Sequence, residues 1–265
     1  MLYSMEINLK KHLDEYYDCL VVYKHSGSRL KNVLQKDIEK YSSEDSKLIL
    51  SSIQVLHDWS GLADNGGGAY TFPTDSAILI TKDHYAKYIN EVLSNQFCHL
   101  YVQSFEGLER LLKNILFELK DDNKITELIQ GKLKQNQKLI RINMPGGEKL
   151  FEIIDGIIGV LEFNKGGFIF NSKSLFFILS MARNGITHNN SNFLKPEIFC
   201  SPDKTGLVIH LFNYEEINNN KKLSLDLIAF KNLIDFMCDF AFQIFKKICI
   251  TQEIDWKVYK NMNKH

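Results

Sequence analysis

The stretch Asp83–Leu119 reads DHYAKYINEVLSNQFCHLYVQSFEGLERLLKNILFEL, and it decides the fold. Apolar residues recur along its second half in steps of three and four: Phe97, Tyr101, Phe105, Leu108, Leu112, Ile115 and Leu119. Because a helix has about 3.6 residues per turn, this spacing places them on one side of an α-helix. The stretch therefore predicts one long helix that is capped by Asp83 and broken by Asp121-Asp122-Asn123.

Later segments repeat this helical spacing. Helices are predicted from Ser172 to about Thr187 and over Leu223–Ile250, with shorter ones at Ile125–Gln135 and Lys149–Phe163. Glu197–Cys200 and Gly206–Phe212 are β-like and are separated by the turn residues Pro202-Asp203-Lys204. These two segments predict a small β-hairpin before the last helix.

The chain before Asp83 is expected to be an N-terminal helical region of unknown role. Helices are predicted over Tyr3–Tyr41 and Asp45–Trp59, and a glycine-rich, loop-like stretch follows at 61–85. We therefore expect three parts: this region at 1–82, a helical domain at 83–250 and a tail at 251–265. The fold class is mainly α, a bundle of four to five helices with a small β-hairpin.

The composition of the chain limits the classes of function that it is expected to have. The 32 basic and 32 acidic residues give no net charge, which argues against a protein that coats nucleic acid but allows one local phosphate-binding cleft. The five cysteines are scattered without a Cys-x-x-Cys pair, which argues against a zinc site and favours the reducing cytoplasm. The apolar runs are shorter than the roughly 18 residues of a membrane span. We expect a cytoplasmic protein without a metal, a cofactor or a membrane partner.

The segment Met181–Asn190, MARNGITHNN, places Arg183 and His188 five positions apart at the end of a predicted helix. Arginine has a permanent charge and a planar fork of donors that fits phosphate oxygens. Histidine accepts or donates a proton near neutral pH. The two types together supply what RNA scission needs, although a surface arginine and a helix-capping histidine would give the same spacing.

This motif resembles the signature of the HEPN superfamily, whose members are small helical bundles and often metal-independent ribonucleases. The order of segments is similar over about 85–250: Ser104-Phe105-Glu106-Gly107-Leu108-Glu109-Arg110 on an early helix, the Arg/His motif on a later one, then a hairpin and a last apolar helix. The resemblance implies that Arg183 and His188 are catalytic, and Asn184 is a usual residue after the arginine.

Other polar residues are expected to line the same cleft and bind substrate. The family often places a polar side chain from the facing helix there, which Glu106, Glu109 or Arg110 could supply. Thr187 shares a helix face with Arg183, and Asn189 begins an asparagine-rich turn that could donate hydrogen bonds to RNA.

The resemblance implies an endoribonuclease that acts on RNA, as a toxin or an anti-phage effector, with an antitoxin or another regulatory protein as its partner. Two alternatives stay open: a non-catalytic HEPN-like module that binds nucleotides or proteins, and a generic helical scaffold. Helix order alone does not decide among them, since one fold serves many functions.

Helix geometry adds one expectation. Side chains five positions apart on a regular helix point about 140° away from each other. Arg183 and His188 can therefore share a site if the helix distorts at Gly185, or if two copies of the chain bring their motifs to one cleft. The family's habit of dimerising favours a homodimer with a shared cleft.

Overall fold

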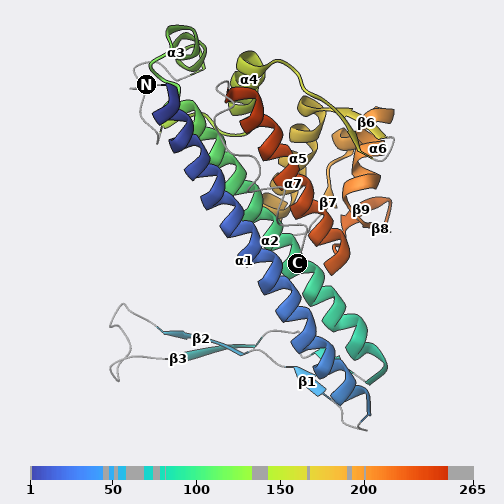
Figure 1. Cartoon of the computed structure of the whole chain (residues 1–265). Helices are drawn as coiled ribbons and strands as arrows, with labels where there is room; N and C mark the ends of the chain where they lie inside the picture. Colours follow the sequence, from blue (N-terminus) through green and yellow to red (C-terminus); the bar gives the residue numbers. More distant parts are fainter. Residues whose placement is uncertain are drawn as a thin grey trace, which may run out of the picture. The chain divides into compact units, whose positions relative to one another are not determined.

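The computed structural model describes residues 2–43, 48–50, 53–57, 69–73, 78–80, 82–132, 143–165, 168–189, 193–199 and 201–249 (Figure 1). These residues are mainly helical, with small antiparallel sheets, so the predicted fold class is confirmed. The chain divides into two compact units, one made of Met1–Arg29 with Leu93–His265 and one of Leu30–Val92. This division differs from the expected boundary after residue 82, because the first part of the N-terminal region belongs to the larger unit.

The described helices are α1 (Leu2–Ser43), α2 (Lys82–Glu118), α3 (Asn123–Gln130), α4 (Gly147–Ile158), α5 (Ser172–Asn189), α6 (Pro202–Leu211) and α7 (Leu227–Ile248). A hairpin of β5 (Glu162–Lys165) and β6 (Phe168–Asn171) precedes α5. A three-stranded sheet has the order β7 (Phe193–Leu194), β9 (Asn220–Leu223), β8 (Tyr214–Ile217). Within the described part of the chain, none of the helices combines the length and the apolar character of a membrane span.

In the larger unit, α2 is the central helix, and the prediction from Asp83 to Leu119 is confirmed to within one residue at each end. Its buried side chains include Phe97, Tyr101, Phe105, Leu108, Leu112 and Ile115. Tyr16 of α1 packs on Gly107, where an added Cβ would lie 3.1 Å from the tyrosine ring. The glycine therefore allows α1 to approach α2 closely.

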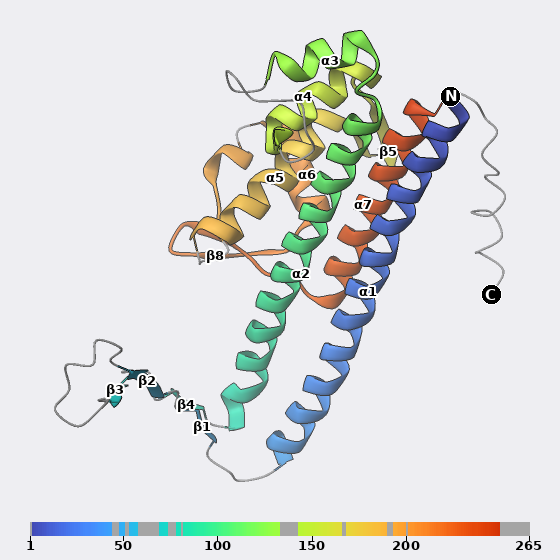
Figure 2. The same ribbon diagram turned by 90° about the vertical axis from the view of Figure 1, so that its left-hand side faces the viewer.

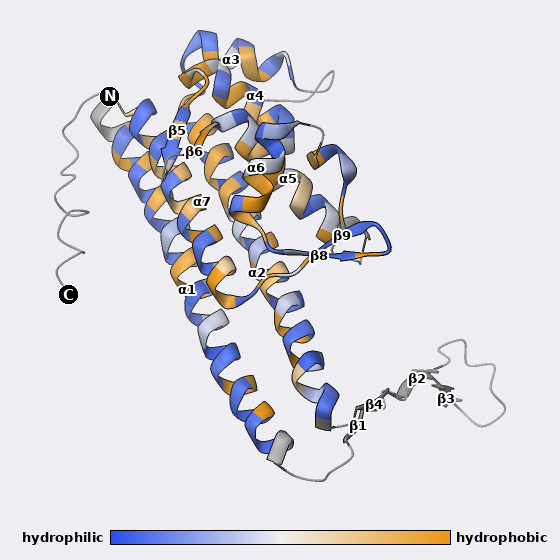
Figure 3. Ribbon diagram, turned by 90° about the vertical axis from the view of Figure 1, so that its right-hand side faces the viewer, coloured by the Kyte–Doolittle hydropathy of each residue, from blue (hydrophilic) through white to orange (hydrophobic). Residues whose placement is uncertain are grey.

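Helix α1 also packs against α7 in the larger unit (Figure 2). The Tyr17 hydroxyl donates to the Cys238 carbonyl oxygen at 3.1 Å, and Lys24 Nζ lies 2.6 Å from Asp235 Oδ1. Residue numbers rise along α1 as they fall along α7, so the two helices are antiparallel. Hydrophilic and hydrophobic residues alternate around both helices, as expected of helices with one buried face (Figure 3).

Aromatic rings join four of the helices into one core. Phe105 of α2 lies 5.3 Å from Phe176 of α5, measured between ring centroids. Phe176 stacks on Phe151 of α4 at 4.5 Å, and Phe151 lies 5.8 Å from Phe240 of α7. Each such pair stabilises by roughly 0.5–1.5 kcal/mol beyond the burial of its area. The packing thus fixes α5, which carries the Arg/His motif, against α2.

The smaller unit holds four short strands between the end of α1 and the start of α2. Strand β1 (Leu48–Leu50) pairs with β4 (Ile78–Ile80), and β2 (Ile53–His57) pairs with β3 (Ala69–Pro73), both antiparallel. The prediction of a helix over Asp45–Trp59 is therefore wrong, because the described parts of that segment are strands whose partners lie later in the chain. Tyr41 of α1 and Tyr85 of α2 meet edge to face at 5.3 Å.

The predicted position of the β-hairpin is also wrong. Residues Pro196–Phe199 form a 3-10 helix, Cys200 lies outside the described residues, and Pro202–Leu211 forms α6. The Ser201 side chain accepts a bond from Lys204 N, and Pro202 stands in the first turn, where a missing N–H costs nothing. In the larger unit, hairpins lie instead at β5–β6 and β8–β9, both before α7. Likewise, the helix predicted to reach Phe163 ends at Ile158, where Gly159 adopts a φ of 75°.

Candidate functional site

Helix α5 positions the Arg/His motif. Asn171 Oδ1 accepts a hydrogen bond from Ser174 N at 2.7 Å and so caps the start of the helix. Leu175, Phe176, Leu179 and Ala182 bury its inner face. The helix continues through Gly185 to Asn189. Of the two alternatives, a break of the helix at Gly185 is therefore not found, and positions five residues apart on a regular helix lie about 140° apart around its axis.

Arg183 contacts the facing helix α2 through Glu109. The distance between Arg183 Nη2 and Glu109 Oε2 is 3.2 Å. The other carboxylate oxygen, Glu109 Oε1, accepts a hydrogen bond from the backbone N–H of Gly147 at 2.6 Å. Gly147 is the first residue of α4. The carboxylate therefore accepts a hydrogen bond from a backbone N–H at the N-terminal, positive end of this helix. One side chain thus links α2, α4 and α5.

The ion pair is largely enclosed by protein. The side chains of Arg183 and Glu109 are 19% and 11% exposed. The guanidinium carbon of Arg183 lies 5.5 Å from the centroid of the Phe105 ring, within the range of a cation–π contact. Arg183 Nε is buried without a hydrogen-bond partner among the described residues. In this surrounding the charges are weakly screened, so loss of either partner leaves a costly unpaired group.

Lys113 of α2 brings one further cation close to the start of α4. A Cβ added to Gly146 would lie 3.6 Å from Lys113 Nζ and 3.8 Å from Glu109 Oε1. Sequence reasoning missed Lys113. The signal was present, because Phe105, Glu109 and Lys113 recur every four residues and such positions share a helix face. Arg183, Glu109 and Lys113 together form what we call the α4 cluster.

The predicted substrate-binding residues divide between this cluster and other surfaces. Glu109 contacts Arg183, whereas Glu106 is exposed and its charge adds to the effect of burial and Cys19 in raising the pKa of Tyr23 on α1. Asn184 is half-buried. Thr187 is exposed and donates from its hydroxyl to the Arg183 carbonyl oxygen at 3.0 Å.

His188 and Asn189 form the last two residues of α5. Their side chains lie outside the described residues. Arg110, the third candidate on α2, is exposed and lines a small cavity beside α1 with His12 and Glu15. Of the three candidates on α2, Glu109 is therefore the one that contacts Arg183.

Tyr101 of α2 holds the backbone of α5 through a hydrogen bond. Its hydroxyl donates to the Leu179 carbonyl oxygen at 2.5 Å, one turn before Arg183. Burial raises the pKa of Tyr101 well above its ordinary value, although the charge of Arg183 acts in the opposite direction. Tyr101 therefore stays protonated at neutral pH and fixes the backbone that carries Arg183.

In the part of the chain that the structure describes, His, Cys, Asp and Glu side chains form no group of three or more that could hold a metal ion. Comparisons with models of protein families, with curated proteins and with solved structures found no match for this chain. The functional assignment therefore depends on the chemistry of the α4 cluster and of the motif on α5.

Proposed function

We propose that this protein is a metal-independent endoribonuclease of the HEPN type, acting as a toxin or anti-phage effector under the control of a regulatory protein. The observation that carries the proposal is the contact between Arg183 and Glu109. It gives the motif arginine a polar partner from the facing helix and holds its guanidinium at the edge of the protein core. A guanidinium has five N–H donors, so one carboxylate contact leaves donors for a phosphate.

In the proposed reaction, the RNA supplies the nucleophile. His188 removes the proton of a 2′-hydroxyl, and the 2′-oxygen attacks the adjacent phosphorus. Arg183 binds the non-bridging oxygens as their negative charge grows. The bond between phosphorus and the 5′-oxygen breaks, and that oxygen takes a proton from a second acid. The products are a 2′,3′-cyclic phosphate and a 5′-hydroxyl.

The second acid is the reason for proposing a homodimer. Because α5 runs without a break through Gly185, one copy of the motif directs positions 183 and 188 to different sides of the helix. Two copies related by a two-fold axis would bring two histidines to one cleft, one as base and one as acid. Sedimentation at the protein concentration of the assay measures the mass. A monomer with full activity would contradict the shared cleft.

The proposal is tested by RNA cleavage in EDTA. Wild-type protein is expected to produce 2′,3′-cyclic phosphate ends. His188→Ala and Arg183→Ala are expected to lose roughly 100-fold or more in rate. His99→Ala and Arg29→Ala are matched controls, because His99 on α2 and Arg29 on α1 are both exposed and neither belongs to the α4 cluster, and they are expected to keep wild-type rates.

Circular dichroism and urea unfolding must show that each variant is folded. Cleavage that survives both Arg183→Ala and His188→Ala in folded protein would contradict the assignment of the motif. Cleavage that disappears on adding EDTA would contradict the metal-independent chemistry.

A second candidate function is a non-catalytic module that binds a nucleotide or a protein. The enclosure of Arg183 favours it: Glu109 already occupies one end of the guanidinium, and Nε is buried. A purely structural arginine would have these surroundings. This alternative predicts that wild-type protein cleaves no RNA and that Arg183→Ala changes only stability.

A further inference from the structure

The carboxylate of Glu109 is held by two groups that would also bind a phosphate. Its Oε2 atom lies 3.2 Å from Arg183 Nη2, and its Oε1 atom accepts a hydrogen bond from the Gly147 N–H at the start of α4. Guanidinium groups and the backbone N–H groups of helix N-termini are common ligands of phosphate oxygens in proteins. Glu109 therefore occupies donors that a phosphate of the substrate would need.

The two contacts of this carboxylate differ in length. The hydrogen bond from Gly147 N is 2.6 Å long, whereas the contact with Arg183 is longer than the roughly 2.7–2.9 Å that is usual for a bond between charged groups. Arg183 Nη1 has no hydrogen-bond partner among the described residues, yet it is not one of the buried atoms without a partner, so it reaches the solvent. An anion that approaches Arg183 therefore meets a free donor beside the weaker of the two contacts.

Lys113 is placed to receive the carboxylate of Glu109. A Cβ added to Gly146 would lie 3.6 Å from Lys113 Nζ and 3.8 Å from Glu109 Oε1, so both charged groups flank this glycine. Among the described residues, no carboxylate forms an ion pair with Lys113. A glutamate pairs well with a lysine four positions later on the same helix. The charge of Glu109 would therefore stay paired if its side chain turned away from Arg183.

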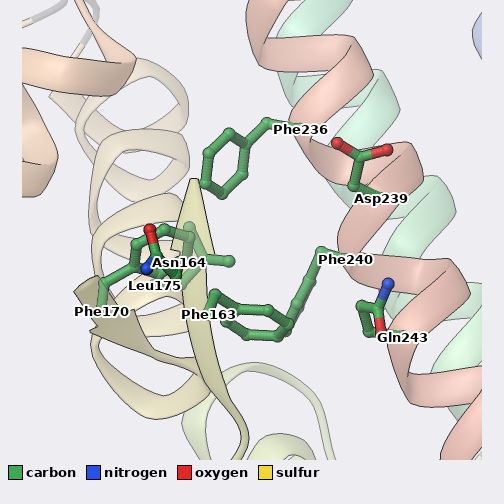
Figure 4. A pocket seen from close by; sticks show the side chains of 8 residues that line it. All are labelled: Phe163, Asn164, Phe170, Leu175, Phe236, Asp239, Phe240 and Gln243. Carbon is green, nitrogen blue, oxygen red and sulfur yellow. The ribbon is translucent and has the colours of Figure 1, made fainter. Parts of the chain in front are cut away.

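The two larger cavities described in this unit offer a phosphate no comparable group of donors. Asp239 is the one charged residue that lines the cavity between the β5–β6 hairpin and α7, among the residues described there (Figure 4). Three carboxylates and Lys173 line the cavity beside α4 and α5. Because an excess of negative charge repels an anion, the α4 cluster is the better place for a phosphate.

From these contacts we infer that Glu109 is a gate on Arg183, and that a phosphate of the substrate displaces its carboxylate toward Lys113. The inference rests on the proposed function, because it concerns the phosphate that Arg183 binds there. Two anions at one guanidinium repel each other, so a phosphate and Glu109 compete for Arg183. The apparent affinity is then lowered to the fraction of molecules in which Arg183 is free. Removal of the gate raises this affinity without adding a contact.

The test measures the binding of an RNA analogue that cannot be cleaved. A fluorescent 2′-O-methyl oligoribonucleotide keeps its phosphates but lacks the nucleophilic 2′-hydroxyl, so binding is separated from chemistry. Fluorescence anisotropy with the full chain gives the dissociation constant. Glu109→Gln keeps an oxygen that can accept from Gly147 N. It is expected to bind about tenfold more tightly than wild type, as when roughly one molecule in ten has Arg183 free. Arg183→Gln is expected to bind more weakly than wild type.

A second pair of measurements tests where the carboxylate goes. Lys113→Gln removes the alternative partner, so it is expected to weaken binding several-fold in the wild-type background and to have little effect in the Glu109→Gln background. A lysine that only contacts the phosphate would weaken both equally. Lys87→Gln and Glu91→Gln are the matched controls, because both residues are exposed on α2 and lie outside the α4 cluster. Their dissociation constants are expected to stay within about twofold of wild type.

Thermal unfolding checks that each variant is folded. If Glu109→Gln does not fold, Glu109→Asp takes its place, since the shorter side chain keeps the charge but withdraws it from Arg183, and tighter binding is again expected. Equal or weaker binding by the folded variant, or no binding by any of the proteins, would overturn the gate. Equal effects of Lys113→Gln in both backgrounds would overturn the role of Lys113.

The outcome of this test is separate from that of the cleavage assay. Wild-type protein that produces 2′,3′-cyclic phosphate ends, while Glu109→Gln binds the analogue no better, would keep the proposed function and remove the gate. Tighter binding by Glu109→Gln without any cleavage by wild type would keep the gate and favour the non-catalytic binding module.

Discussion

At the scale of single residues, Glu109 is the group on which the candidate site depends. Its two carboxylate oxygens hold Arg183 Nη2 and the Gly147 N–H. We expect Glu109→Gln and Arg183→Met each to lower the unfolding free energy by about 2 kcal/mol, because each leaves a mostly buried charge unpaired. The double variant is expected to cost less than the sum, with a coupling of roughly 1–2 kcal/mol.

Urea denaturation of the four proteins in this cycle measures the coupling. Glu106→Gln is the control, since Glu106 lies on the same helix but is exposed. Its effect is expected to be within about 0.5 kcal/mol. Strict additivity of the Glu109 and Arg183 effects would show that the 3.2 Å contact contributes nothing measurable.

The half-buried carboxyl group of Asp155 makes the unfolding free energy depend on pH. Burial raises the pKa of Asp155, although the Ser172 hydroxyl, which donates to its Oδ1 at 3.2 Å, and the charge of Lys173 act in the opposite direction. Between the ordinary and the raised pKa, the folded protein binds more protons than the unfolded chain. The contribution of Asp155 to the unfolding free energy therefore falls as pH rises through this window.

Asp155→Asn is expected to remove that contribution. Urea titrations at a series of acidic pH values should show a smaller loss of stability with rising pH in the variant than in the wild type. Asp203→Asn, at the exposed start of α6, is the control. Identical slopes in Asp155→Asn and wild type would contradict the raised pKa.

At the scale of elements, helix caps differ in strength by their geometry. Asp226 Oδ1 accepts from Ala229 N at 2.7 Å at the start of α7, whereas Ser201 Oγ accepts from Lys204 N at 3.4 Å at the start of α6. We expect Asp226→Ala to lower the unfolding free energy by about 1 kcal/mol and Ser201→Ala by less. Asp226→Asn should keep most of the stability, and urea midpoints decide the order.

The helices of the larger unit were predictable because their signal is local. In α2 and α7 the apolar residues recur in steps of three and four over many turns, and such a stripe has few other ways to be buried. The β5–β6 hairpin shows the opposite case. Phe163 was assigned to the end of a helix, since its strand partner Phe170 is recognisable only through the pairing itself.

The strand prediction for segment 206–212 was wrong for a related reason. Leu207-Val208-Ile209 has β-branched residues that favour a strand, but Ser201 and Pro202 start a helix just before it. In the candidate site, the placement of Arg183 and His188 on one helix was predictable from the local sequence. The contact of Arg183 with Glu109, and not with Glu106 or Arg110, could not be predicted. It depends on how α2 is turned toward α5, and the packing of several helices decides that orientation.

At the scale of the whole molecule, α1 belongs to the same core as the motif helix. Leu13 on α1 is fully buried, whereas Val21 on the same helix is 64% exposed. We expect Leu13→Ala to lower the unfolding free energy by about 2–5 kcal/mol and Val21→Ala to change it by less than about 0.5 kcal/mol. A separate N-terminal domain would instead unfold in its own transition, which calorimetry would detect.

The contacts between α1 and α7 join residues 211 and 221 positions apart in the chain. A ribosome adds about 5–20 residues per second, so α1 is made roughly 10–45 s before the helix that covers it. During this interval α7 is absent, although Leu9, Leu13 and Leu20 on α1 are all buried in the native fold. The nascent chain is therefore expected to depend on chaperones, or on early pairing of α1 with α2, until α7 emerges.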